Sequence, residues 1–106
     1  QTFQANSDAN GTVRNYLKTV IRTRYISIVP KKWYLGICMR VEIYGCEACG
    51  RELGLSNGRV LNTQLTASSH MGDLHRPQYA RLKNPTRVWC AALEDTKPFL
   101  QVDLQT

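Results

Sequence analysis

The fold of this chain is decided by the stretch Ile37-Cys38-Met39-Arg40-Val41-Glu42-Ile43-Tyr44. In it the apolar side chains of Met39, Val41 and Ile43 alternate with the charged side chains of Arg40 and Glu42. Successive side chains of a β-strand point to opposite faces, so this period of two predicts a strand with one face against a hydrophobic core. A helix would bring Arg40 and Ile43 onto the same stripe, where a core-facing surface does not accept an arginine.

Other stretches around it also have strand character. Residues 19–30 are dense in Val, Ile and Tyr and end at Pro30, which cannot donate to a strand ladder. Residues 98–104 alternate again, and a further candidate strand spans residues 59–67. Turn signals separate these stretches, and no segment of ten or more residues has a helical period. The sequence therefore predicts an all-β sandwich or barrel, with turns or loops at residues 31–36, 54–58, 68–78 and 84–85.

The composition is that of a small globular protein with a basic surface. The chain has 106 residues, of which 42% are hydrophobic, and a formal net charge of +6. A positive charge favours acidic partners, but the Lys and Arg residues are dispersed, which is more typical of an ordinary solvated surface. A nucleic-acid binder would rest on this charge alone, so we expect no nucleic-acid partner. No apolar run is long enough to span a bilayer, and no targeting pattern follows Gln1.

Four cysteines leave two interpretations open. Cys38, Cys46, Cys49 and Cys90 are disulfide partners in an oxidising compartment. The alternative is an intracellular zinc or redox protein that uses the C-x-x-C pair of Cys46 and Cys49. Structural disulfides are favoured, because the two histidines of the chain do not form a second ligand pair and no helix signal follows Gly50. The sequon at Asn10 adds a candidate N-glycosylation site and agrees with an extracellular protein.

Several blocks of the chain resemble the discoidin family, also called the coagulation factor 5/8 type C domain. Residues 24–30, Trp33 and residues 37–46 resemble the C-terminal end of such a domain. Cys49 and residues 53–54, 64–69, 79–82, 89 and 99–104 resemble the beginning of one. The resemblance implies a partial galactose-binding-like β-sandwich, or jelly-roll barrel, in an extracellular protein, either secreted or part of a cell-surface ectodomain.

The order of these blocks is reversed relative to a single domain. We therefore expect the C-terminal part of one discoidin-type domain at residues 1–46, a linker at 47–48 and the N-terminal part of a second domain at 49–106. A circularly permuted single domain is the other account. Under the tandem account, the segment belongs to a repeated array cut between two copies.

The resemblance also gives the cysteines a meaning. Family members bond the first cysteine to the last, and Cys49 resembles a first cysteine whereas Cys46 resembles a last. Discoidin domain receptors, which have the most similar cysteine pattern, add a second disulfide. Cys90, which follows Trp89, resembles one cysteine of that bridge, and Cys38, which precedes Met39-Arg40-Val41-Glu42, resembles the other. In a tandem array these cysteines would find their partners in other parts of the parent. A bridge between Cys38 and Cys90 requires the two halves to fold together.

The family binds its ligands through loops at one end of the barrel. By resemblance, the candidate binding loops are residues 70–76 and 83–88. Their candidate contact residues are His70, Met71, Asp73, Leu74, His75, Arg76, Lys83 and Arg87. The expected partners are a carbohydrate, a matrix protein or an anionic cell-surface ligand. Membrane contact should be weak, because Met71 and Leu74 are the only apolar side chains offered, at about 2 kcal/mol each at best.

Catalysis is not expected, and neither is a cofactor or a metal. Ser68 and Ser69 lie in the same loop as His70 and Asp73, but catalytic triads draw their members from separate structural elements. The aromatic residues have two interpretations. A stacking platform for sugar or nucleic acid is one, and core packing is favoured because each lies beside a strand signal: Tyr25, Trp33, Tyr79 and Trp89.

Overall fold

The computed structural model describes residues 2–3, 5, 11–17, 21–33, 36–45 and 51–104, with the backbone alone described at 51–52. Its regular structure consists of short β-strands and single turns of 3-10 helix, and no α-helix occurs in the described residues. Accordingly, none of the described helices is long and apolar enough to cross a membrane. The predicted all-β fold class is confirmed.

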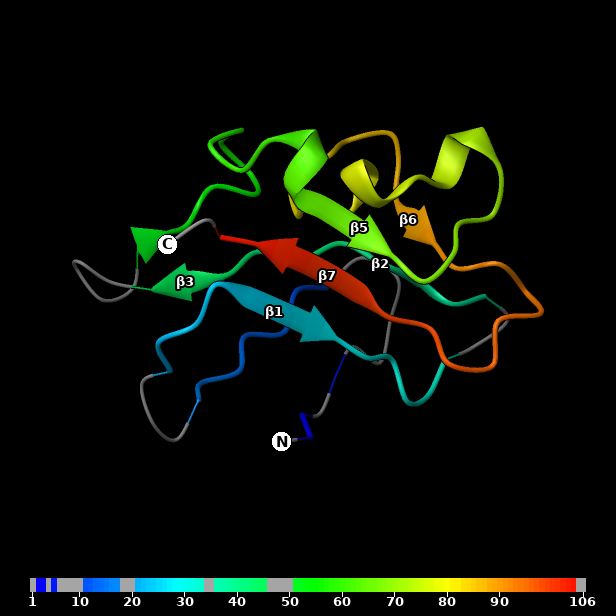
Figure 1. Cartoon of the computed structure of the whole chain (residues 1–106), viewed down its shortest axis with the longest axis horizontal. Helices are drawn as coiled ribbons and strands as arrows, with labels where there is room; N and C mark the ends of the chain where they lie inside the picture. The colour runs from blue at the N-terminus through cyan, green and yellow to red at the C-terminus, as the bar shows by residue number, and fades with distance from the viewer. Residues whose placement is uncertain are drawn as a thin grey trace.

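A three-stranded antiparallel sheet forms the centre of the molecule (Figure 1). It contains β1 (Tyr25–Ile28), β7 (Leu100–Asp103) and β5 (Leu65–Ala67), with β7 in the middle. The alternation predicted for residues 98–104 is confirmed in β7, because Leu100 and Val102 are fully buried whereas Gln101 and Asp103 are half-exposed. The sheet joins the two halves of the sequence, since β1 precedes the C-x-x-C pair whereas β7, with which it pairs, and β5 both follow it.

The stretch that predicted the fold forms several short pairings instead of one continuous strand. β2 (Cys38–Met39) pairs with β6 (Trp89–Cys90), and β3 (Tyr44–Gly45) pairs with β4 (Arg51–Glu52). Between β2 and β3, Val41 forms an isolated bridge with Arg81. The strand is interrupted because its successive residues hydrogen-bond to different segments of the chain. The predicted facing of side chains is nonetheless confirmed, because the core is contacted by Met39, Val41 and Ile43.

The strand predicted at residues 59–67 is correct only for its last three residues. A 3-10 turn, η1 (Asn62–Gln64), precedes β5. The buried side chain of Gln64 stabilises this turn, because its Oε1 accepts a hydrogen bond from the Leu61 amide (2.9 Å) and its Nε2 donates to the Asp103 carbonyl (2.8 Å). Sequence periodicity does not detect such a turn, since the decisive partner lies 39 residues away.

Two buried clusters form the interior. One contains Ile37, Ala80, Trp89, Ala91 and Leu100. The other contains Leu55, Val60, Leu65 and Val102. Side chains from residues 37–43 pack against both clusters, so the segments before and after the C-x-x-C pair share one hydrophobic interior.

A disulfide between Cys38 and Cys90 crosses the β2–β6 pair and links positions 52 residues apart in the chain. This is the bridge that required the two halves to fold together. Cys46 and Cys49 lie outside the described residues, and so does Asn10. The pairing of Cys46 and Cys49, their use in a zinc or redox site and glycosylation at Asn10 therefore stay predictions.

The aromatic residues divide between core and surface. Trp89 is fully buried and Tyr79 is half-buried, as expected for core packing. The same expectation is wrong for Tyr25 and Trp33, whose exposed fraction is 49% each. Tyr25 points outward from β1, with the guanidinium of Arg24 5.1 Å from its ring centre. Trp33 follows Pro30, beyond the point where β1 leaves the sheet.

The carboxylate of Glu42 connects the segment after β2 to the turn that follows β4. It accepts hydrogen bonds from the backbone amides of Ile43 (2.9 Å), Leu55 (3.1 Å) and Ser56 (2.9 Å). Desolvation by burial lowers the pKa of the nearby Arg81, and the negative charge of Glu42 opposes part of this shift. A charged acceptor of three partly buried amides makes Glu42 a structural residue.

We expect Glu42→Ala to lower the free energy of unfolding by about 2 kcal/mol, because three partly buried amides lose a charged acceptor. Urea denaturation followed by tryptophan fluorescence measures this change. Glu94→Ala is the matched control, since Glu94 is exposed, and it should change the value by less than about 0.5 kcal/mol. Equal effects of the two substitutions would contradict the structural role of Glu42.

Candidate functional site

The candidate loop at residues 70–76 begins at a fixed base. Ser69 anchors this base, because its carbonyl accepts the indole N–H of buried Trp89 (2.9 Å) and its hydroxyl oxygen accepts the amide of Ala92 (3.0 Å). One residue into the loop, the amide of Met71 donates to the carbonyl of Cys90 (2.8 Å). Gly72, at φ +72°, has a conformation that favours glycine and leads into η2 (Asp73–His75).

The second candidate loop, at residues 83–88, is a turn built by one side chain. Oδ1 of Asn84 accepts the amides of Thr86 (3.2 Å) and Arg87 (3.1 Å), which confirms the turn predicted at Asn84-Pro85. The guanidinium of Arg87 donates to the hydroxyl of Tyr79 (3.0 Å) and lies 5.0 Å from the centre of its ring. Tyr79 belongs to η3 (Pro77–Tyr79), which directly follows the first loop.

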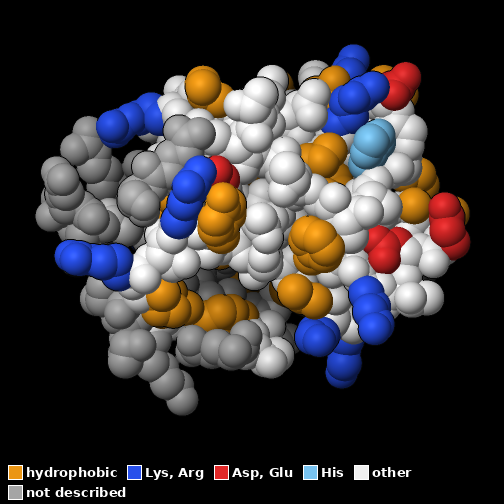
Figure 2. Space-filling view, in the orientation of Figure 1, with side chains coloured by type: hydrophobic (Ala, Val, Ile, Leu, Met, Phe, Trp, Pro, Cys, Tyr) orange, Lys and Arg blue, Asp and Glu red, His pale blue; other side chains and the backbone are white. Residues whose placement is uncertain are grey.

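The structure brings the two candidate loops together. Nδ1 of His75 lies 3.2 Å from the carbonyl oxygen of Val88, so the end of the first loop contacts the end of the second. His75 is half-buried at this contact, so part of its side chain connects the two loops and is not available to a ligand. Figure 2 shows histidine surface beside apolar and basic side chains on the face that it draws.

The predicted contact residues differ in how free they are to bind a ligand. Leu74 is 60% exposed and Met71 is 37% exposed, and His70 is also exposed. The charge of Arg76 is largely compensated, because its guanidinium lies 2.7 Å from the carboxylate of Asp73. Lys83 and Arg87 are the exposed basic residues of the second loop. The loop end therefore combines apolar surface with positive charge, and Asp73 and Arg76 form an internal pair.

Sequence reasoning missed Asp95, which holds the base of the first loop in place. Its Oδ2 accepts the hydroxyls of Ser68 and Ser69 (2.6 Å each), and its Oδ1 accepts the amide of Lys97 (3.0 Å). These hydrogen bonds favour the charged form and hold the pKa of Asp95 below its ordinary value of 3.8. The two serine hydroxyls are thus directed to Asp95. The short distances across 26 and 27 residues are not visible in a sequence pattern.

We expect Asp95→Asn to lower the melting temperature at neutral pH, with a difference from the unmodified protein that shrinks in acid. The folded-state pKa of Asp95 lies below the unfolded-state value, so its stabilisation is present above the unfolded-state pKa. It is lost as the pH falls through the folded-state pKa. Thermal unfolding of both proteins from about pH 7 to about pH 2 measures this. Glu94→Gln, which removes a neighbouring carboxylate, should show no such convergence.

The arrangement supplies contact surface and does not assemble a catalytic set among the described residues. Ser68 and Ser69 hydrogen-bond to Asp95, and Nδ1 of His75 contacts the backbone carbonyl of Val88. Within the same residues, no group of three or more His, Cys, Asp and Glu side chains is placed to hold a metal ion. The groups that this loop end offers to a ligand are apolar surface, hydrogen-bonding side chains and positive charge.

Comparison with known proteins gives whole-length similarity to curated relatives. Rat neuropilin-2 (Rattus norvegicus) is 40% identical over 113 residues, which cover 100% of this chain and 12% of the relative. Mouse coagulation factor V (Mus musculus) is 42% identical over 110 residues, which cover 96% of this chain and 5% of the relative. Neuropilin-1 of Xenopus laevis is 37% identical over 111 residues, which cover 96% of this chain and 12% of the relative.

The chain thus spans about an eighth of the length of the neuropilins it matches and less of factor V. No protein-family model and no solved structure matches it. The matched relatives carry discoidin domains and are secreted or cell-surface proteins, so the chain is extracellular. Similarity over the whole chain, the all-β fold and the matched sequence blocks agree: the chain belongs to the discoidin, or coagulation factor 5/8 type C, domain family.

Proposed function

We propose that this chain is a non-catalytic extracellular adhesion or recognition segment that binds its ligand through the loops at residues 70–76 and 83–88. The observation that carries this function is the contact between His75 and Val88, which joins the two loops into one surface. The family relationship supports a binding role, and the ligand is a carbohydrate, a matrix protein or an anionic cell surface.

The apolar and basic side chains on this surface favour some classes of ligand over others. Exposed Leu74 and Met71 supply apolar contact, and Arg87 and Lys83 supply positive charge. Insertion of Met71 and Leu74 into a membrane would contribute about 2 kcal/mol each at best, so contact with a membrane is weak. An anionic glycan or an acidic matrix surface gains from both kinds of contact.

The double variant Leu74→Ala/Arg87→Ala tests this function against a matched control at another part of the surface. Leu61→Ala/Arg59→Ala is that control, because Leu61 is 59% exposed and Arg59 is exposed. The probes are immobilised heparin, fibrillar collagen, and vesicles of phosphatidylcholine with phosphatidylserine. We expect the loop variant to bind at least one of these probes about tenfold more weakly, while the control binds like the unmodified chain. Equal affinities of both variants for every probe, or no binding to any of them, would reject the loop site.

The proposed domain organisation is a junction between two discoidin-type domains: the end of one at residues 1–46, a linker at 47–48 and the start of the next at 49–106. One continuous alignment to rat neuropilin-2 covers the whole chain, so the two sets of blocks follow each other in the same order in that relative. This shared order supports a tandem array over a circularly permuted domain. The parent sequence provides the test: the tandem requires a Trp-Cys block upstream and an Arg-Val-Glu block downstream.

A further inference from the structure

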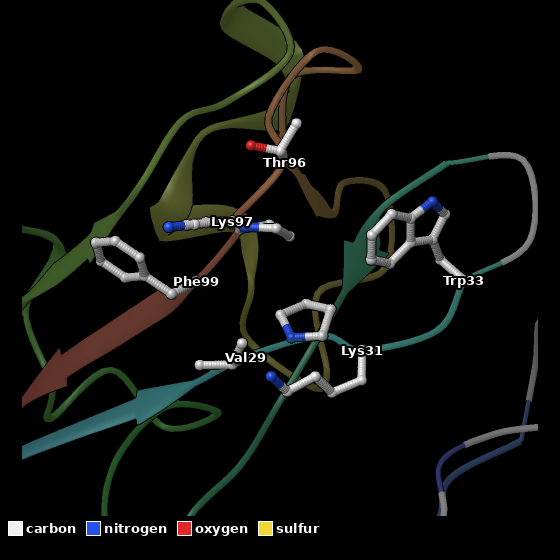
Figure 3. Close-up of a pocket in the computed structure, with 8 residues that line it drawn as sticks. Val29, Lys31, Trp33, Thr96, Lys97 and Phe99 are labelled. Atoms are coloured by element: carbon white, nitrogen blue, oxygen red, sulfur yellow. The ribbon is translucent and has the colours of Figure 1, made fainter.

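A half-open pocket lies between the segment that follows the end of β1 and the segment that precedes the start of β7. Its volume is about 480 Å³, which is within the range of small ligand sites. Figure 3 shows the ring of Phe99 and the indole of Trp33 on opposite sides of it, with the side chain of Lys31 between them along the lower edge. The lining residues are Val29, Pro30, Lys31, Trp33, Thr96, Lys97, Pro98 and Phe99.

The opening of this pocket follows from the strand register. The last residue pair of the β1–β7 ladder is Ile28 with Leu100. Two positions beyond this pair, each segment has a proline, Pro30 after β1 and Pro98 before β7. A proline has no amide hydrogen and cannot continue a ladder, so the two segments separate there. The gap between them is lined by the residues that flank the prolines.

The walls of the pocket are apolar, and Pro98 in them is buried whereas Pro30 and Phe99 are half-exposed. Trp33 is 49% exposed and Val29 is 47% exposed, and the two prolines and Phe99 complete the walls. Large apolar side chains that remain accessible in a concave site indicate a place where a partner is bound. The hydroxyl of Thr96 and the indole N–H of Trp33 are the neutral side-chain donors in the lining, which leaves few directional contacts for a sugar.

The rim of the pocket is basic. Lys31 and Lys97 belong to the lining, and Lys32 is the exposed neighbour of the first. No described residue forms an ion pair with Lys31 or Lys97. Asp95, two residues before Lys97, has its carboxylate hydrogen-bonded to Ser68, Ser69 and a backbone amide. The positive charges at the rim are therefore available to an anionic partner.

We propose that this pocket binds an acidic peptide segment of a partner protein, with one aromatic or aliphatic anchor side chain between Trp33 and Phe99 and flanking carboxylates at Lys31 and Lys97. Apolar walls with a cationic rim are complementary to such a segment. A second copy of this chain is a poor occupant, because its net charge of +6 would be repelled by the same lysines. None of the lining residues belongs to the loops at 70–76 and 83–88, so the pocket is a second site, distinct from the proposed loop surface.

Trp33 provides the readout for the test, since the other tryptophan, Trp89, is fully buried. The 106-residue chain is titrated with the peptide acetyl-EEFDD-amide, and the fluorescence emission of tryptophan is followed. We expect a shift of the emission to shorter wavelength on binding, because the anchor covers the exposed indole. The same peptide with alanine in place of phenylalanine should bind about tenfold more weakly or worse, and acetyl-KKFKK-amide should not bind.

Charge reversal then tests the rim. Lys31→Glu/Lys97→Glu should weaken binding of acetyl-EEFDD-amide by about tenfold or more. Arg22→Glu/Arg59→Glu is the matched control, because it changes the net charge equally at exposed positions outside the lining and should keep the affinity within about twofold. Circular dichroism and thermal unfolding establish that both variants are folded. Trp33→Phe should abolish the emission change while isothermal titration calorimetry still detects binding.

Three results would each overturn the proposal. The first is an unchanged emission with acetyl-EEFDD-amide up to about 5 mM, where even weak binding would be visible. The second is equal affinity of the charge-reversed variant and its control. The third is binding of a heparin hexasaccharide at Trp33 without binding of either acidic peptide, which would make the site one for an anionic glycan.

Discussion

Removal of the disulfide by Cys38→Ala/Cys90→Ala should lower the free energy of unfolding by about 4 kcal/mol, the loss expected when a loop of this length is no longer closed. The bridge spans 52 residues and joins segments from the two halves of the chain. A domain of this size has a net stability of only about 5–15 kcal/mol, so the variant should lose a large share of it. Urea denaturation, compared with the unmodified chain, measures the loss.

The comparison is best made with Cys46 and Cys49 replaced by alanine in both proteins, so that no other thiol can exchange with Cys38 or Cys90. Reduction of the bridge-containing protein should then reproduce the unfolding midpoint of the bridge-free variant, whereas the reductant should not affect the variant itself. Identical midpoints of the two oxidised proteins would show that the bridge does not hold the halves together.

Leu100→Ala should lower the free energy of unfolding by about 2–5 kcal/mol, because it creates a cavity at the centre of the sheet. Leu100 is fully buried, lies on the middle strand β7 and pairs with both neighbouring strands, opposite Ile28 and Ala67. The same substitution at Leu93 is the matched control, since Leu93 is 67% exposed. It removes the same atoms from a site already in contact with water, and its effect should stay below about 0.5 kcal/mol.

Thermal unfolding and urea denaturation of both leucine variants measure the difference. Similar losses for Leu100→Ala and Leu93→Ala would show that β7 is not the centre of the hydrophobic interior. A large loss for Leu100→Ala alone would support a single interior shared by the segments before and after the C-x-x-C pair.

The parts of the fold that the sequence predicted correctly depend on local alternation. In residues 98–104, Leu100 and Val102 face the core because side chains alternate along any strand. Met39, Val41 and Ile43 follow the same rule and pack inward. The predicted lengths were less accurate, because a strand ends where its hydrogen-bond partner ends. The stretch around Val41 pairs with three different segments and is therefore divided.

The candidate site was predictable only in its location along the chain. The family resemblance placed the candidate binding loops at residues 70–76 and 83–88, but the contact between His75 and Val88 is a distance in space, which the sequence does not record. Asp95 was missed because a single carboxylate among charged residues has no sequence signal. The exposure of Trp33 was missed because an aromatic residue beside a strand signal usually packs inward, whereas Trp33 lies beyond the last β1–β7 pair and is 49% exposed.

The sequence alone determined the fold class, the family and the faces of the strands, because alternation and motif blocks are properties of neighbouring residues. The tertiary structure decided which segments pair. It joined β1 to β7 and Cys38 to Cys90, and thereby united two blocks that the sequence resemblance predicts to lie in separate domains. In a tandem array each domain would contain both an N-terminal and a C-terminal block. The surface that an N-terminal block offers to a C-terminal block is therefore the same whether the two belong to one domain or to neighbouring domains. Long-range pairing depends on this complementarity of surfaces, which no local pattern records.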